Sequence, residues 1–342
     1  MKKLRLLLLP FSWIYGSITA LRNVLYDTGI LKTYTIPNNS ICVGNLSVGG
    51  TGKTPHVDLI AGHFISQHKS VATLSRGYGR STEGLLEATQ KSTAAEIGDE
   101  PLLYKSKYGK NLRVIVSEKR IDGVKYIQKN TPNNTIILLD DAFQHRAVKA
   151  GLNIIITEYS NLFIDDFHLP AGNLREWKSG IKRADIIIVS KCPVIESEEK
   201  EVISNRLNFD PTKIFFSHID YGKFKGFSTQ TVATIKNILL VTGIGNPAPL
   251  LGHLNLQYNV MHLRFKDHHA FTPKDIAEIH EKFDSFASHN KIILTTEKDY
   301  VRLRGFSQIE TNKNHWFYQP ITTIIDELEE FNLLLDEHVK NV

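Results

Sequence analysis

One stretch of the sequence decides the fold, Ser47-Val48-Gly49-Gly50-Thr51-Gly52-Lys53-Thr54. It follows an apolar run at 41–43 that predicts a strand, and it precedes residues 53–67, which predict a helix. Glycines let backbone N–H groups close around phosphate oxygens, and the helix directs the positive end of its dipole at the anion. This order of elements predicts a phosphate-binding loop. Lys53 would reach the β- and γ-phosphates of a nucleotide, and the Thr54 hydroxyl would ligate Mg²⁺.

Short apolar runs alternate with helical patterns around this loop. Strands are expected at 41–43, 71–74, 114–116, 135–139, 153–157 and 185–189, with helices at 53–67, 100–108 and 119–129. The runs are rich in Ile, Val and Leu and show no clear in–out alternation, which is typical of parallel strands buried on both faces. The alternation therefore predicts an α/β fold, with the phosphate loop on a doubly wound, mostly parallel sheet.

The second half of the chain repeats this theme more weakly. Strands are expected at 213–217, 238–241, 260–265 and 292–295, and helices at 247–254, 273–283 and 321–339. Asp210-Pro211 and a mostly polar run at 220–225 interrupt the pattern between the halves. We therefore expect an N-terminal segment at 1–35, a nucleotide-binding domain at 36–215, and a second, smaller α/β lobe at 216–342 that completes the cleft.

The composition excludes several classes of protein. Of the 342 residues, 42% are hydrophobic and 23% charged, which suits a globular protein with a core rather than a disordered chain. The two cysteines stand in no metal-binding pattern, so a disulfide framework or a structural zinc site is not expected. A net charge of +5 suits an anionic partner, yet there is no nucleic-acid-binding signature.

The N-terminus is basic at 1–5 and strongly apolar after that. A leucine run at 6–9 is followed by the aromatic residues Phe11, Trp13 and Tyr15. Aromatic side chains beside Lys and Arg are typical of a helix at a membrane interface. The apolar stretch is shorter and more interrupted than the roughly 20 residues that a span needs. We expect membrane association; a surface helix, a single span and an ordinary buried helix stay open as interpretations.

Two carboxylates end one of the expected strands. Ile136-Ile137-Leu138-Leu139 is followed by Asp140 and Asp141, and then closely by Gln144 and His145. In phosphate-loop enzymes a carboxylate at such a strand end holds the shell of the magnesium ion. Consecutive side chains alternate sides on an extended strand, so the sequence does not decide which aspartate contacts the metal.

A candidate general base stands at the start of another expected helix. Asp99 and Glu100 precede Pro101, and proline suits a first helical turn. Spacing alone favours Asp99 as the cap of that helix. A base that accepts the proton of an attacking alcohol is the alternative. His268 and His269 supply imidazoles in the second half, and either one could polarise Asp99.

Seven strings together resemble one family, the tetraacyldisaccharide 4′-kinases of lipid A synthesis. They are Ser-Val-Gly-Gly-Thr-Gly-Lys-Thr-Pro at 47–55, Ser-Arg-Gly-Tyr-Gly at 75–79, Gly-Asp-Glu-Pro at 98–101, Asp-Asp-Ala-Phe-Gln-His at 140–145, Leu-Pro-Ala-Gly-Asn-Leu-Arg-Glu at 169–176, Phe-Lys-Asp-His at 265–268 and Thr-Glu-Lys-Asp at 296–299. Ser47 stands where the usual phosphate loop has glycine, and serine belongs to this family's loop. Most of the strings are weak signals singly, but they are specific in this order.

The resemblance implies a lipid kinase of the lipopolysaccharide pathway, at the cytoplasmic face of the inner membrane. It would transfer the γ-phosphate of ATP to the 4′-hydroxyl of a tetraacylated glucosamine disaccharide 1-phosphate, using Mg²⁺. No nucleic acid and no obligate protein partner is expected. Asp99 is implied as the base, assisted by His268. The other implied residues are Ser47, Val48, Gly49, Gly50, Thr51, Gly52 and Lys53 for nucleotide, Thr54, Asp140 and Asp141 for metal, and Arg76, Gln144, His145, Asn173, Arg175 and Glu176 for the acceptor.

Three rival functions can be compared with this one. A membrane-associated ATPase switch would use the same loop, but it leaves the strings at 98–101 and 265–268 without a shared task. A GTPase would need a guanine-reading Asn-Lys-x-Asp loop, and Ser190-Lys191-Cys192-Pro193 differs from it at both specificity positions. A membrane-binding module without activity leaves the phosphate loop unexplained.

Overall fold

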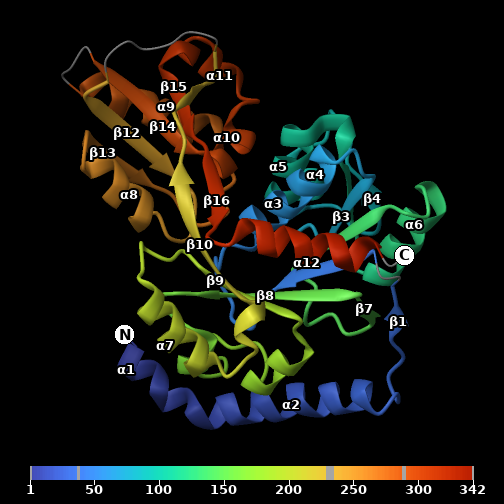
Figure 1. Ribbon diagram of the computed structural model, residues 1–342. Coiled ribbons are helices and arrows are strands. Elements are labelled where there is room, and N and C mark those ends of the chain that lie inside the picture. The colour runs from blue at the N-terminus through green and yellow to red at the C-terminus, as the bar shows by residue number, and fades with distance from the viewer. Residues whose placement is uncertain (1, 37–38, 229–234, 287–289, 341–342) are drawn as a thin grey trace.

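The computed structural model describes residues 2–36, 39–228, 235–286 and 290–340, which form two α/β lobes around two sheets (Figure 1). From edge to edge the large sheet holds β16 (Ile321–Ile325), β10 (Ile214–Tyr221), β9 (Ile186–Ser190), β8 (Leu152–Glu158), β2 (Ser40–Gly44), β6 (Ile136–Asp140), β3 (Val71–Ser75), β5 (Arg113–Val116) and β4 (Leu86–Glu87). The strands from β10 to β5 are parallel, whereas the edge strands β16 and β4 are antiparallel to their neighbours.

The second lobe is built on a smaller sheet. Its strands, in spatial order, are β11 (Lys225–Gly226), β15 (Trp316–Gln319), β14 (Lys291–Thr296), β12 (Asn237–Thr242) and β13 (Asn259–Arg264). They are parallel except for β11. A short parallel pair, β1 (Tyr34–Thr35) with β7 (Val148–Lys149), lies outside both sheets.

Helices cover both faces of each sheet. One face of the large sheet packs against α3 (Lys53–Ser66), α5 (Asp99–Tyr108) and α12 (Leu328–Lys340), and the other against α6 (Arg120–Asn130) and α7 (Ser197–Leu207). The small sheet lies between α9 (Pro273–Ser285), α10 (Glu297–Leu303) and α11 (Ser307–Glu310) on one face and α8 (Ala248–Asn255) on the other. The predicted doubly wound sheet with a second, smaller α/β lobe is confirmed.

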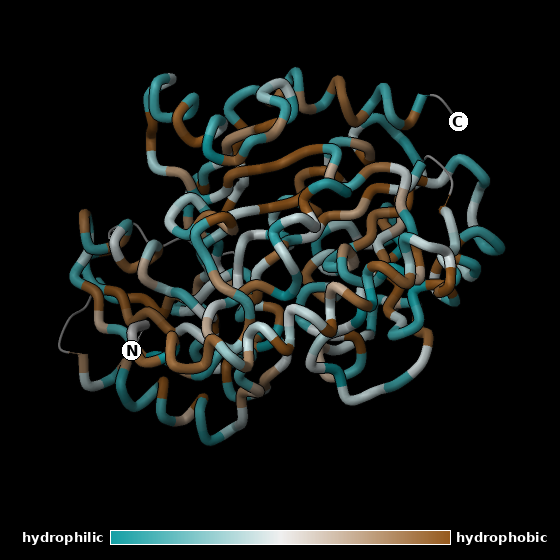
Figure 2. Tube along the Cα trace, turned by 90° about the horizontal axis from the view of Figure 1, so that it is seen from below, coloured by the Kyte–Doolittle hydropathy of each residue, from teal (hydrophilic) through white to brown (hydrophobic). Residues whose placement is uncertain are grey.

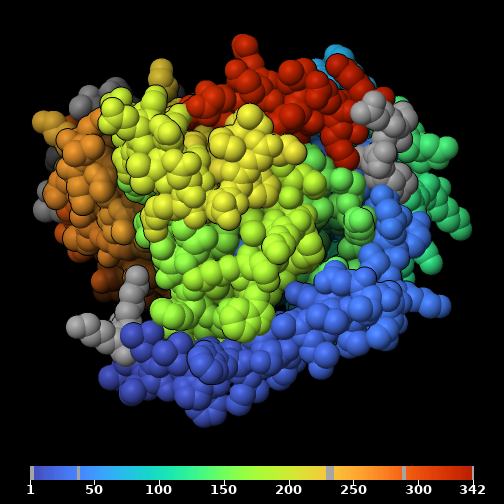
Figure 3. Space-filling view, turned by 60° about the horizontal axis from the view of Figure 1, so that its bottom comes forward, coloured from blue at the N-terminus to red at the C-terminus, as the bar shows by residue number. Residues whose placement is uncertain are grey.

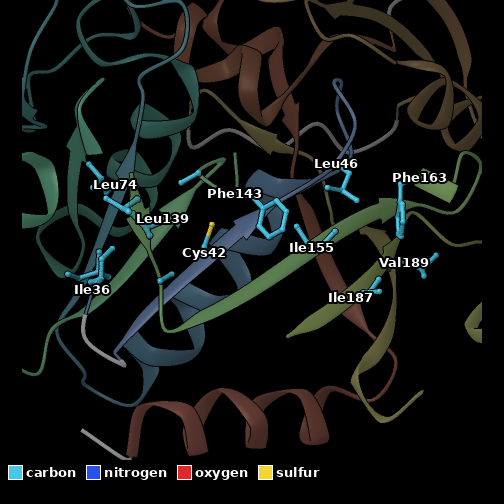
Figure 4. Packing of buried hydrophobic residues seen from close by; sticks show 14 of the residues in the cluster. Ile36, Cys42, Leu46, Leu74, Leu139, Phe143, Ile155, Phe163, Ile187 and Val189 are labelled. Carbon is cyan, nitrogen blue, oxygen red and sulfur yellow. The ribbon is translucent and has the colours of Figure 1, made fainter. Parts of the chain in front are cut away.

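The core explains why the strands are apolar throughout. Leu74, Leu139, Cys42, Ile155 and Ile187 come from five adjacent strands and lie side by side on one face of the large sheet (Figure 4). All five are at most 3% exposed, and burial of each of the four Leu and Ile side chains contributes about 1.5–3 kcal/mol. Hydrophobic stretches accordingly recur along the chain (Figure 2).

The chain crosses between the lobes at two neighbouring points. It leaves the large sheet after β10 and enters β11, and it returns from β15 into β16. Gly222 N donates to Pro320 O (3.1 Å), and the Gln319 amide donates to Gly222 O (2.6 Å) and Pro320 O (2.9 Å), so the two crossings are tied together. The expected border at 215–216 falls within β10, and residues 321–340 belong with the large sheet.

The helix expected over residues 321–339 is wrong in its first part. The β-branched run Ile321–Ile325 forms β16, which pairs antiparallel to β10, and the helix begins only at Leu328. Ile and Thr lose side-chain freedom in a helix and fit a strand well. Pairing with the exposed edge of β10 therefore outweighs the apolar periodicity that continues into α12.

The N-terminal segment forms α1 (Lys2–Arg5), a 3₁₀ turn at Leu6–Leu8 and α2 (Leu9–Asp27). It lies as a continuous band along the base of the first lobe (Figures 1 and 3). Small residues face inward, with Ser12 and Gly16 buried. Large apolar side chains face outward, and these are more than half exposed: Leu4, Leu7, Phe11, Trp13, Ile14, Ile18, Leu21 and Val24. Among the described residues, no helix is long and apolar enough to cross a membrane.

Candidate active site

The phosphate loop connects β2 to α3, and side chains of neighbouring residues hydrogen-bond to it. Gly49 and Gly52 have φ of 115° and 93°, a region that favours glycine. The Asn45 amide donates to Thr51 Oγ1 (2.8 Å), and Ser190 Oγ donates to Thr51 O (2.7 Å). A Cβ built on Gly49 would meet no atom within 4 Å, so the outer side of the loop is open space for phosphates. Ser190, from the mismatched guanine string, thus supports the loop.

Lys53 begins α3 and points toward the acidic end of β6. Its Nζ lies 3.8 Å from Asp141 Oδ2, and Arg175 Nη2 lies 2.7 Å from the other oxygen, Asp141 Oδ1. Burial would raise the pKa of Asp141, but the charges of Lys53 and Arg175 outweigh it and the pKa lies below its usual value. Asp141 adopts φ of 50°, which turns its carboxylate away from Asp140 toward these cations. Asp141 is therefore ionised and paired at neutral pH.

Asp140 is the buried member of the acidic pair, at 3% exposed. Tyr104 donates its phenol proton to Asp140 Oδ2 over 2.9 Å. Burial, with the nearby charges of Glu100 and Asp141, raises the pKa of Asp140 to about 7. Asp140 is thus buried beside two other carboxylates, which disfavours its ionised form.

These oxygens suit a magnesium ion shared with phosphates. Within the described ranges, no group of three His, Cys, Asp or Glu side chains could hold a metal by itself. Mg²⁺ commonly takes one or two carboxylates and fills its other positions with substrate phosphates and water. Asp140, Asp141 and the hydroxyl of Thr54 offer that donor chemistry, and the raised pKa of Asp140 marks a place where a cation would relieve repulsion.

The second lobe places two side chains on Asp99. Asp99 Oδ2 lies 2.8 Å from His268 Nδ1, and Asp99 Oδ1 lies 3.4 Å from Arg302 Nε. His269 lies elsewhere, with its Nε2 3.0 Å from Asp275 Oδ2. Burial would raise the pKa of Asp99, but the His268 hydrogen bond and the Arg302 charge outweigh it and lower the pKa. Of the two histidines, His268 is therefore the one in contact with Asp99.

Spacing alone favoured Asp99 as a helix cap, and that interpretation is wrong. Gly98, with φ of 92°, occupies the N-cap position, and Asp99 is the first residue of α5. A Cβ at Gly98 would lie 3.0 Å from Tyr78 O, so the close backbone approach also requires glycine. The Asp99 carboxylate is directed across the cleft to the second lobe rather than to its own helix.

Several side chains of this site are not predicted by the sequence. Arg302 pairs with fully buried Asp299 (3.0 Å) and donates to His269 O (3.0 Å), which fixes the loop that carries His268. Lys298 Nζ lies 3.3 Å from Glu100 Oε1 and 3.4 Å from His268 Nε2. The string at 296–299 contains Lys298 and Asp299 and so pointed to this part of α10, but Arg302 lies just beyond the string.

The residues expected to bind the acceptor substrate differ in how far they are buried. Arg76 is exposed and lines an open cavity of about 730 Å³ with Tyr78 and Lys119, and the Tyr78 ring contacts that of His268 (5.3 Å between centroids). His145 is half-buried, and burial together with the charges of Arg120, Arg22 and Arg76 lowers its pKa. This cationic surrounding suits an anionic head group.

Gln144, Asn173 and Glu176 lie below that surface. The Gln144 amide donates to Asn45 O (2.8 Å) and to Glu176 Oε1 (2.9 Å). Glu176 is 1% exposed and also pairs with Arg183. Asn173 O accepts the Val48 N–H of the phosphate loop (2.8 Å). The structure thus places these three residues beside the loop, each with at least one hydrogen bond to protein.

The chain is similar to known proteins along nearly its whole length. Residues 4–340 match the tetraacyldisaccharide-1-P 4′-kinase family. The chain is 42% identical to the tetraacyldisaccharide 4′-kinase of Flavobacterium psychrophilum, covering 100% of this chain and 98% of that one. It is 40% identical to the enzyme of Bacteroides fragilis, covering 97% and 91%.

A solved structure has the same architecture. The crystal structure of LpxK from Aquifex aeolicus in complex with ATP superposes with a TM-score of 0.75 and 30% identity, over 98% of this chain and 99% of that one. A match along nearly the whole length covers the phosphate loop, the acidic strand end and both lobes. The chain belongs to the tetraacyldisaccharide-1-P 4′-kinase family.

Proposed function

We propose that this protein transfers the γ-phosphate of ATP to the 4′-hydroxyl of a tetraacylated glucosamine disaccharide 1-phosphate, giving the bis-phosphorylated lipid A precursor. Family membership supports the overall reaction. One observation carries the assignment of roles: the Asp99 carboxylate faces His268 at 2.8 Å and stands at the start of the helix whose Tyr104 binds Asp140. Five residues of helix rise about 7.5 Å, so one rigid helix carries the proposed base and the tyrosine that binds the metal carboxylate Asp140.

The roles follow from charge and position. Asp99, ionised because its pKa is lowered, accepts the proton of the 4′-hydroxyl. The hydroxyl oxygen then forms a bond to the γ-phosphorus, and the bond from that phosphorus to the β–γ bridging oxygen breaks, which releases ADP. Lys53 and the loop N–H groups neutralise charge on the phosphate oxygens. Mg²⁺, held by Thr54 and the acidic strand end, supplies further neutralisation when bound.

His268 would fix the orientation of Asp99 through its hydrogen bond. Since His268 comes from the second lobe, the base is fully oriented only when the lobes are together. Arg76 and His145 would face the acceptor head group. Gln144, Asn173, Arg175 and Glu176 would support it from behind, because hydrogen bonds and ion pairs within the protein already occupy them.

The decisive experiment measures phosphate transfer from labelled ATP to the acylated disaccharide. Asp99→Asn keeps the shape of the side chain but cannot accept the proton, so transfer should fall by at least about 10²-fold. Binding of ATP should be unchanged. ATP hydrolysis that proceeds without lipid and is insensitive to this substitution would favour an ATPase switch instead.

We further propose that the protein works on the cytoplasmic face of the inner membrane, with α2 lying in the interface. The support is the inverted pattern of this helix, which buries Ser12 and Gly16 and exposes Trp13, Ile14 and Ile18. A helix of a water-soluble domain buries its large apolar side chains. The acyl chains of the acceptor lie in a bilayer, so such a face would bring the cleft to its substrate.

A further inference from the structure

The inner face of α2 is bonded to one segment of the first lobe, residues 168–177. Ser12 Oγ donates to His168 O and accepts from Ala171 N, both at 2.9 Å. The Tyr15 hydroxyl donates to Arg175 O (3.1 Å). Trp177 Nε1 donates to Gly16 O (2.7 Å), and a Cβ on Gly16 would lie 3.0 Å from the Trp177 ring. The helix thus contacts this segment through several fixed polar bonds as well as through packing.

The opposite side of the same segment pairs with the phosphate loop. Ser47 and Leu174 form an antiparallel bridge. Arg175 N donates to Leu46 O, and Val48 N donates to Asn173 O, each at 2.8 Å. Residues 173–175 therefore act as a short strand beside the start of the loop. A displacement of α2 would be transmitted through this segment to the backbone that surrounds the phosphates.

A partly buried chain of side-chain hydrogen bonds also connects α2 to the phosphate loop. The Asn23 amide of α2 donates to Glu176 Oε2 (2.9 Å), and Glu176 Oε1 accepts from Gln144 (2.9 Å). The same Gln144 amide donates to Asn45 O (2.8 Å), and Asn45 binds Thr51 inside the loop. Glu176 is 1% exposed, so its charge relies on these partners and on Arg183.

We infer that Asn23 and Glu176 are positioning residues for the nucleotide, and that the N-terminal helix forms part of the scaffold of the phosphate loop. The two faces of α2 therefore have different tasks. The outer face meets the bilayer, and the inner face holds the loop in its binding conformation. This inference rests on the proposed function, because it takes ATP as the ligand of the loop.

The test uses the full chain in detergent, with ATP alone and no lipid. Asn23→Leu removes the amide that binds Glu176, at nearly constant size, and should weaken ATP binding by about fivefold or more. Ser17→Leu makes the same kind of change on the exposed side of α2 and should leave ATP affinity unaltered. Asn23→Gln, which keeps the donor, should restore part of the loss. Circular dichroism and the unfolding midpoint of each variant show whether it is folded.

Coupling of this kind is reciprocal, which gives a measurement on the unaltered protein. Bound ATP should slow amide hydrogen exchange in α2, at residues 12–26, and Asn23→Leu should reduce that protection. The inference is overturned if ATP leaves exchange in α2 unchanged, or if folded Asn23→Leu binds ATP as tightly as Ser17→Leu does. Failure of the unaltered protein to bind ATP would instead refute the proposed function, and this inference with it.

Discussion

Arg302 Nε lies 3.4 Å from Asp99 Oδ1, while His268 Nδ1 lies 2.8 Å from Asp99 Oδ2. Both partners belong to the second lobe, whereas Asp99 and the phosphate loop belong to the first. The Asp99 carboxylate is consequently positioned by side chains of the second lobe, although Asp99 itself belongs to the first lobe. Arg302 is only 6% exposed at its side chain and is anchored by Asp299, so this contact is part of a buried cluster rather than a surface ion pair.

The first prediction concerns this contact. Arg302→Gln removes the charge that lowers the pKa of Asp99, so that pKa should rise. If Asp99 is the base, as proposed, it acts in its ionised form, so the acidic limb of the pH–rate profile should move to higher pH. The kcat should fall about tenfold or more with ATP affinity retained.

The single change leaves Asp299 buried without its cation. The double variant Asp299→Asn/Arg302→Gln avoids that cost and should show the same shift in the pH profile. An unshifted acidic limb in both variants would mean that Arg302 serves stability alone.

The second prediction concerns Tyr104. Tyr104→Phe removes the donor to Asp140, and the loss of a buried hydrogen bond to a carboxylate should lower the free energy of unfolding by about 1–3 kcal/mol. The Mg²⁺ concentration needed for half-maximal transfer should also change, because the carboxylate loses its fixed orientation. Tyr108→Phe is the matched control on the same helix, since that phenol donates to Asp58 O. Equal effects of the two substitutions on the Mg²⁺ requirement would argue against a role for Tyr104 in the metal site.

The third prediction uses the raised pKa of Asp140. In the unfolded chain an aspartate has a pKa of about 3.9, whereas the pKa of Asp140 in the folded protein is about 7. The folded state therefore holds its proton more tightly, and ionisation of Asp140 destabilises the folded protein increasingly from about pH 4 to pH 7.

Asp140→Asn removes this penalty. Without divalent ions, it should raise the free energy of unfolding at pH 8 by on the order of 2 kcal/mol and should bring little gain at pH 4.5. Asp141→Asn should do the reverse at pH 8, because Asp141 is paired with Lys53 and Arg175 and its pKa is lowered. Denaturant unfolding at both pH values measures these effects. If Asp140→Asn raised the free energy of unfolding equally at pH 8 and pH 4.5, the raised pKa of Asp140 would be contradicted.

The fourth prediction separates the two faces of α2. Ile14→Ser/Ile18→Ser removes apolar side chains that are 60% and 63% exposed, and should weaken binding to anionic lipid vesicles by about tenfold or more. ATP affinity in detergent should stay the same. Leu256→Ser, at a position that is 81% exposed in the second lobe, is the control and should leave vesicle binding unaltered. Undiminished vesicle binding by the double variant would place the membrane contact elsewhere.

The sequence predicts much of the fold because its signals are local. The strand ending at Gly44, the glycine loop and the helix from Lys53 appear where periodicity and glycine spacing place them. β16 was missed because its strand character depends on β10, a partner about a hundred residues away. A pattern of apolar residues predicts that a segment is buried, but it does not show which part of the chain packs or pairs with that segment.

The site shows the same limit. Sequence strings name Asp99, His268 and Asp140, since the family resemblance identifies them. They do not show that His268 rather than His269 meets Asp99, because the choice is made by a loop in which His268 adopts φ of 56°. Nor do they show Tyr104, whose contact with Asp140 exists only after α5 packs on the sheet.

The paired crossings at Gly222 and Pro320 have a mechanical consequence. The two segments that join the lobes, one between β10 and β11 and the other between β15 and β16, are hydrogen-bonded to each other through Gln319, so they would bend together. His268, Lys298 and Arg302 all belong to the second lobe, so a movement of that lobe about this point would displace them together. Asp99 would then lose the His268 hydrogen bond and the Arg302 charge together, and both of the interactions that lower its pKa would disappear in one step.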